Sequence, residues 1–149
     1  MNKIDFTKES FTKLDRFMKQ NAGLNLATAN LKDAALLDGC NWNRLKRSRE
    51  ALITQLKAYQ RLHKIVPEGN PAEKDRVIKA LLGKNIHSSL QIASMPRQRF
   101  IREYLPLFDG QEEQILETYQ NALTQRSQVL LQYMHMLQSN EPHMGAARM

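Results

Sequence analysis

Apolar residues recur along almost the whole chain at the spacing of one helix face, and this pattern restricts the fold more than any other feature. Successive apolar positions lie three, four or seven residues apart, and no segment shows a convincing strand alternation. The chain of 149 residues is long enough for one domain with a substantial core. We therefore predict an all-α, multi-helix, bundle-like domain with two long amphipathic helices and several short ones.

Start and stop signals place the boundaries of these helices. Thr7 is the expected N-cap of the first helix, and Gly39 ends the second. Pro71 suits the first position of a helix, where its missing N–H is not needed. Asp109, followed three residues later by Glu112, is an aspartate version of the capping box and marks the start of the last helix. The expected helices span 8–20, 28–37, 42–65, 71–83, 88–93, 96–105 and about 28 residues from 109 onward.

The sequence VPEGNP over 66–71 is the clearest break in the chain. It separates an N-terminal helical part, 1–66, from a helical module, 71–140, and we expect the two to form one compact unit. Residues 141–149, EPHMGAARM, have no periodicity and are expected to be a flexible tail.

Each long helix carries an apolar stripe that needs a partner to cover it. The sequence leaves open whether the long helices cover each other or bind another chain. Leu90 and Phe100 are expected in the core, together with Ile86 and Ile92. The stripe of the last helix consists of Ile115, Tyr119, Ala122, Val129, Tyr133 and Leu137.

Catalytic and metal-binding patterns are missing from the sequence. Cys40 is the only cysteine, and we expect it to be a small residue in a turn. The carboxylate pairs Glu73/Asp75 and Glu112/Glu113 fall where the first turns of helices are expected, where acids stabilise the helix. The histidines are isolated from one another in the sequence: His63, His87, His135 and His143. The sequence therefore predicts no enzyme, no metal and no cofactor.

A surplus of basic residues opens an alternative function. Lysine and arginine number 22 against 15 acidic residues, which gives a net charge of +7. The segment 80–93 has the outline of a helix-hairpin-helix, although it has one glycine in the turn where the usual motif has two. The alternative is a small basic nucleic-acid-binding module. Its binding residues would be Gly83, Lys84, Arg97, Arg99 and Arg102.

Three further segments carry a resemblance to a known family. They are NIHSSLQIASMPRQRF over 85–100, YLPLFDG over 104–110, and a long helix with Tyr119, Asn121, Ala122 and Arg126. Their order resembles a helical segment near the start of insecticidal toxin-complex A components and the related virulence-plasmid A proteins. LKAYQR over 56–61 is similar to relatives of these proteins, so the resemblance covers roughly 56–138.

The resemblance implies a non-enzymatic helical module that assembles with other chains of a toxin-complex or secretion system, and it leaves a homo-oligomer open. It implies a chain made in the bacterial cytoplasm, with export as part of a toxin assembly as a further option. The first residues lack the apolar stretch of a secretory signal, and no stretch is long and apolar enough to span a membrane, so we expect a chain that is soluble when made. We expect contacts through exposed stripe residues and through the loop around His87 and Asp109.

Overall fold

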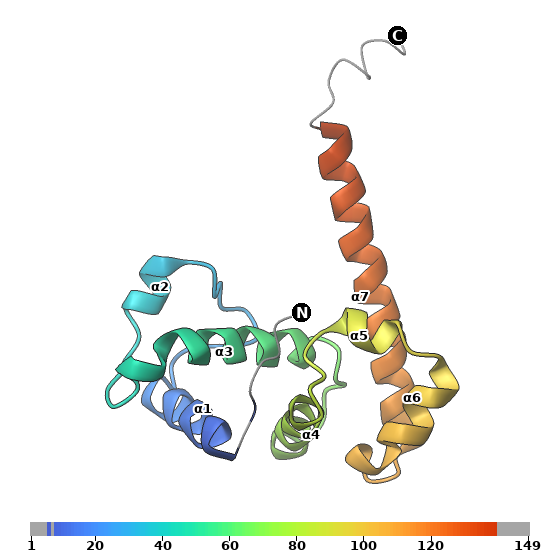
Figure 1. The fold of residues 1–149 in the computed structure, drawn as a ribbon, viewed down its shortest axis with the longest axis horizontal. Helices are drawn as coiled ribbons and strands as arrows, with labels where there is room; N and C mark the ends of the chain where they lie inside the picture. Colours follow the sequence, from blue (N-terminus) through green and yellow to red (C-terminus); the bar gives the residue numbers. More distant parts are fainter. Residues whose placement is uncertain (1–5, 7, 140–149) are drawn as a thin grey trace.

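The computed structural model describes residue 6 and residues 8–139, and this part of the chain is built from helices without a strand (Figure 1). The predicted all-α, multi-helix fold is therefore confirmed. The α-helices are α1 (Lys8–Gln20), α2 (Ala34–Asp38), α3 (Arg49–His63), α4 (Pro71–Gly83), α5 (Ser89–Ala93), α6 (Arg97–Tyr104) and α7 (Glu112–Ser139). Two 3-10 helices complete the described elements, η1 (Lys46–Ser48) and η2 (Leu105–Phe108).

Helix α3 crosses the N-terminal side of the body, with α1 on one side of it and α2 on the other (Figure 1). The rings of Phe17 in α1 and Trp42 lie 4.8 Å apart at their centres. The Trp42 indole N–H donates to the carbonyl of Leu37 at 2.7 Å, and the Arg49 guanidinium lies 5.0 Å from the centre of the indole. Trp42 thus joins α1, the end of α2 and the start of α3.

A partly exposed polar network ties α4 to α1 and α3. The Lys79 ammonium lies 2.6 Å from Asp15 and 2.9 Å from Asp75, and the Tyr59 hydroxyl donates to Asp75 at 2.6 Å. Burial lowers the pKa of Lys79, but the hydrogen bonds to the two carboxylates outweigh it, so the pKa of Lys79 is raised. The network therefore holds a charged lysine between three helices.

The first half of α7 packs against α5, α6 and η2. Phe100 of α6 is completely buried there, with ring centres of Tyr104, Phe108 and Tyr119 at 5.3, 6.5 and 5.8 Å. One cluster of buried apolar side chains runs from Leu14 in α1 to Ala122 in α7. The core therefore draws on both sides of the VPEGNP loop.

Several predicted boundaries agree with the structure. Helix α1 has the predicted span, 8–20, whereas Thr7 and residues 141–149 lie outside the described residues. Helix α4 begins with Pro71 as predicted, because the Asn70 side chain accepts a hydrogen bond from the Ala72 N–H at 3.0 Å. Helix α5 begins in the same way, with the Ser88 hydroxyl as acceptor for the Gln91 N–H.

The predicted helices over 28–37 and 42–65 begin too early. Residues 28–33 form a loop with turns instead of a helix. The Asn25 and Asn30 side chains accept the N–H groups of Ala27 and Lys32 and compete with a helix. Helix α3 begins at Arg49, after a turn and the 3-10 helix η1, and Arg44 has a positive φ of 64° that an α-helix does not accept. Only α7 therefore has the length expected of a long helix.

The predicted N-cap at Asp109 is also wrong. Asp109 has a left-handed backbone, with φ 54° and ψ 33°, and its carboxylate pairs with Arg76 at 2.8 Å. Gly110 has a positive φ of 73° and supports the turn. Helix α7 begins three residues after Asp109, at Glu112, so Glu112 is not the third residue of the helix.

Candidate protein-interaction surface

Helix α7 changes its surroundings at Arg126. Before this residue, the Tyr119 hydroxyl donates to the Met95 carbonyl at 2.6 Å, and the Asn121 amide donates to the Ile65 carbonyl at 2.9 Å. The Arg126 guanidinium donates to the Ala93 carbonyl at 3.3 Å. These bonds fix the first half of α7 to the body.

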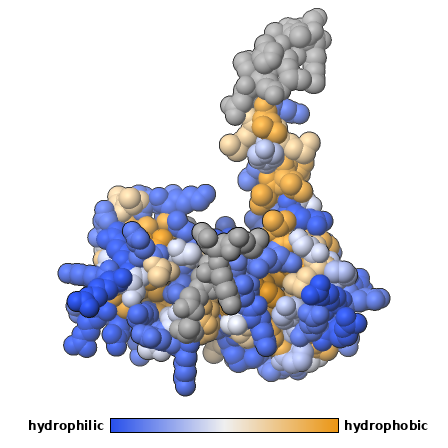
Figure 2. Space-filling model, in the orientation of Figure 1, coloured by the Kyte–Doolittle hydropathy of each residue, from blue (hydrophilic) through white to orange (hydrophobic). Residues whose placement is uncertain are grey.

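Every side chain from Ser127 to Gln138 is exposed. We call these residues the α7 tip. The tip projects away from the body as a single helix (Figure 1), and Figure 2 shows apolar residues along it, in contrast to the mostly hydrophilic body. Seven large apolar side chains of the tip are between 46% and 64% exposed: Val129, Leu130, Leu131, Tyr133, Met134, Met136 and Leu137.

The apolar side chains gather on one side of the tip. At about 100° per residue, six of the seven fall within an arc of roughly 160°, and Leu131 lies outside it. The opposite arc contains the uncharged or weakly basic side chains of Gln128, Gln132 and His135. The apolar arc lies on the same side of α7 as the buried residues Ile115 and Ala122. The helix face that packs on the body in the first half of α7 is therefore exposed in the tip.

The tip carries no formal charge, because residues 127–139 include no Asp, Glu, Lys or Arg. Among the described helices, none combines the length and apolar character that a membrane crossing requires. An apolar, uncharged helix face that projects into solvent is typical of a surface that binds another protein. The sequence stripe had included Val129, Tyr133 and Leu137 but missed the neighbouring arc residues Leu130, Met134 and Met136.

Leu90 was predicted to lie in the core, and this prediction is wrong. It is 60% exposed, because the short helix α5 turns Ile92 and Ala93 toward the core and Leu90 to the outside. Phe100 is buried, as predicted.

The backbone N–H groups of the predicted hairpin turn are already engaged in hydrogen bonds within the turn. Gly83 is the last residue of α4, and the N–H groups of Lys84, Asn85 and Ile86 donate to the carbonyls of residues 80–82 at 2.9–3.2 Å. A phosphate would have to compete with these bonds. Nucleic-acid binding at this turn stays a prediction.

The remaining residues of the alternative site lie on α6. Arg97, Arg99 and Arg102 are exposed, and Arg99 is paired with Glu103 at 3.0 Å. A hollow of about 440 Å³ lies beside Lys84, and the three arginines are absent from the described residues that line it. The structure therefore does not bring Lys84 and the arginines into one hollow.

A different hollow, of about 460 Å³, gathers basic side chains that the sequence reasoning missed. Lys57 and Arg61 lie on one face of α3, and Lys64 directly follows the helix. Lys32 joins them from the loop before α2. No Asp or Glu stands among the described residues that line this hollow. The spacing of Lys57, Arg61 and Lys64 was visible in the sequence, but the position of Lys32 required the fold.

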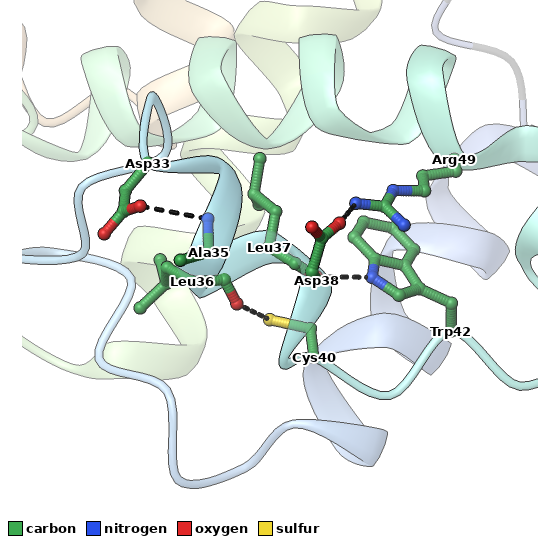
Figure 3. Close-up of polar contacts among 8 residues, drawn as sticks. All are labelled: Asp33, Ala35, Leu36, Leu37, Asp38, Cys40, Trp42 and Arg49. Atoms are coloured by element: carbon green, nitrogen blue, oxygen red, sulfur yellow. Dashed lines mark hydrogen bonds and ion pairs between the residues drawn. The ribbon is translucent and has the colours of Figure 1, made fainter.

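Cys40 lies in the turn after α2, as expected (Figure 3). Its thiol donates to the Leu36 carbonyl at 3.4 Å, and burial raises the pKa of the thiol against the opposing effect of Arg49. The Arg49 guanidinium is paired with Asp38 beside it. The thiol is therefore protonated near neutral pH and is not an activated nucleophile.

The described residues include no group of three or more metal-ligating side chains. The carboxylate pair Glu73/Asp75 is engaged in ion pairs, Glu73 with Arg76 and Asp75 with Lys79. The His87 carbonyl accepts from Arg61, whereas Asp109 pairs with Arg76, so the loop predicted around His87 and Asp109 consists of two separately anchored segments.

His63 is expected to make the fold sensitive to mild acid. Burial and the nearby Lys74 ammonium lower the pKa of His63 below its ordinary value of about 6.5. Between the lowered pKa of His63 in the folded chain and its ordinary pKa in the unfolded chain, the unfolded chain binds more protons. Stability therefore falls as the pH drops below about 6.5. We expect a lower melting temperature at pH 5.5 than at pH 7.5.

The variant His63→Gln should lose less melting temperature over the same interval than the unchanged chain. His87 retains part of the effect, because burial and Arg61 lower its pKa in the same direction. Glu68, whose pKa is lowered by its hydrogen bond to Lys74, contributes only at more acidic pH. An equal loss in both proteins would contradict the assignment to His63.

The fold and the tip define an all-α protein with one uncovered helix end. No protein-family model, curated protein or solved structure matches the chain. The resemblance to toxin-complex A components therefore gains no support from these comparisons and stays a prediction.

Proposed function

We propose that this protein is a non-enzymatic assembly module that binds another protein through the α7 tip. One observation carries the proposal: seven large apolar side chains are exposed on an uncharged helix end that projects from the body. Burial of apolar surface contributes about 25 cal/mol per Å², so a partner that covers the arc would gain several kcal/mol. The recognition mode is an amphipathic helix laid against an apolar surface.

We further propose that the assembly is part of a bacterial toxin-complex or virulence system. The support is the resemblance over 56–138, which includes the tip and the helices that hold α7. The wider assembly would contain toxin-complex or secretion proteins, and the chain would be made in the bacterial cytoplasm, with export within the assembly left open.

The experiment compares three tagged baits in lysate from the native cells: the unchanged chain, Met134→Lys and Gln132→Lys. Met134 lies in the apolar arc and Gln132 in the opposite arc, and both are exposed, so each variant adds the same charge without disturbing the core. We expect Met134→Lys to lose the polypeptides that the unchanged chain binds and Gln132→Lys to retain them. Mass spectrometry identifies the polypeptides.

Recovery of the same polypeptides by all three baits would contradict the tip as the binding surface. Recovery of toxin or secretion polypeptides would support the proposed system, and their absence from all polypeptides bound by the unchanged chain would count against it.

A second candidate function is nucleic-acid binding, which the hollow with Lys32, Lys57, Arg61 and Lys64 favours. Phosphate contacts would make the affinity for a labelled DNA duplex fall by orders of magnitude between about 50 and 200 mM salt. The double variant Lys57→Gln/Lys64→Gln should weaken binding if this hollow is used, and Arg97→Gln/Arg102→Gln if α6 is used. Fluorescence anisotropy without a change at low salt would exclude this candidate.

A further inference from the structure

We propose that the partner of the α7 tip is a second copy of this chain, and that the two tips pack antiparallel with Tyr133 at their centre. The inference rests on the proposed function, because it requires the tip to be a binding surface. Three properties of the tip support it: its charge, the spacing of its apolar residues and the place where it leaves the body.

The distribution of charge permits self-association. Each copy has a net charge of +7, so two copies repel each other over most of their surfaces. Residues 127–139 carry none of that charge, apart from the weakly basic His135. The tip is thus a long exposed segment on which two copies can meet without bringing like charges together.

The spacing of apolar residues suits helix pairing. Val129, Tyr133 and Met136 are separated by four and three residues, and Leu130, Met134 and Leu137 repeat the same spacing one position later. Alternate steps of three and four keep a seam on one side of a helix and let side chains interdigitate with an identical helix. The apolar arc is therefore complementary to itself.

The position of the body selects the antiparallel arrangement. Parallel tips would place the two Arg126 residues only about 8–10 Å apart, the usual distance between packed helix axes, with two positively charged bodies side by side. Antiparallel tips centred on Tyr133 separate the Arg126 residues by about 20 Å along the axis, because each residue advances 1.5 Å. This separation exceeds the screening length of about 8 Å at physiological salt.

In this register Val129 faces Leu137 of the second copy, and Tyr133 faces its counterpart. The six side chains of the arc, each with on the order of 100 Å² exposed, would bury roughly 600 Å² per copy, which is the lower limit of stable protein interfaces. We therefore expect a dimer that dissociates on dilution.

The first experiment measures the mass of the full chain by sedimentation velocity between about 1 and 200 μM, the range where an interface at this size limit dissociates. We expect the mass to rise from 17.3 kDa toward twice that value. Met134→Lys should weaken dimerisation about tenfold or more, because it places a charge in the seam, whereas Gln132→Lys should leave it unchanged. Circular dichroism of both variants checks that each retains the helical fold.

A chain that stays at 17.3 kDa at every concentration would overturn the second copy as the partner. The proposed function would still stand if Met134→Lys lost lysate polypeptides that Gln132→Lys retained. If the chain stayed monomeric and all three baits recovered the same polypeptides, the dimer and the proposed function would both be contradicted. Dimers that are equally stable in both variants would also overturn the inference, because the contact would then lie elsewhere.

The second experiment tests the orientation by disulfide formation in a Cys40→Ser background, which removes the only native cysteine. A mixture of Val129→Cys and Leu137→Cys chains should form a crosslinked dimer, because antiparallel tips bring the two positions within disulfide distance. Val129→Cys alone should not crosslink. Efficient crosslinking of Val129→Cys with itself would show parallel tips and overturn the arrangement.

Discussion

Replacement of Phe100 by alanine is expected to lower the free energy of unfolding by about 3–5 kcal/mol. The side chain is fully buried and meets the rings of Tyr104, Phe108 and Tyr119 within 6.5 Å. The substitution leaves a cavity where α6, η2 and α7 meet, and it removes three aromatic contacts. Urea denaturation followed by circular dichroism measures the loss.

The matched control is Leu90→Ala, on the neighbouring helix α5. Because Leu90 is 60% exposed, its truncation should change the free energy of unfolding by no more than about 0.5 kcal/mol. The sequence pattern placed both residues in the core, so the pair separates that expectation from the structure. Similar losses in the two variants would mean that Leu90 is buried, contrary to the structure.

The difference between these two residues shows what periodicity can and cannot predict. Local signals were sufficient for the start of α4, because Asn70 and Pro71 act within their own turn. They were misleading at Asp109, where a capping pattern competes with an ion pair to Arg76 from α4. A partner 33 residues away is invisible to a pattern of four residues.

The candidate sites follow the same rule. The sequence predicted that a stripe extends along the last helix and left its partner open, because an apolar stripe has the same spacing whether or not something covers it. Only the fold shows that the contacts of the body with α7 end near Arg126. Likewise, Lys57, Arg61 and Lys64 could be placed on one helix face, but Lys32 reaches them through the turns before α2.

The largest kinetic contrast is expected within α7 itself. Backbone amides of residues 130–138 should exchange with solvent at least about 100-fold faster than those of residues 115–125 in dilute solution. Residues 115–125 are held by buried side chains and by the bonds of Tyr119 and Asn121, whereas each side chain of the tip is exposed. Helical hydrogen bonds without tertiary packing open readily, because a short helix is marginal in water. Hydrogen exchange followed by NMR resolves the two halves.

The concentration dependence of this exchange links the stability of the tip to its proposed role. If two tips pack together, amides around Tyr133 should become protected as the concentration rises, while exchange at residues 115–125 stays constant. In the Met134→Lys variant the tip amides should remain unprotected from exchange at concentrations where the tip amides of Gln132→Lys are protected. Equal protection of both halves in dilute solution would show that the tip is stable alone and would remove the need for a partner to order it. A helix end that becomes ordered only when covered would instead couple the folding of α7 to assembly.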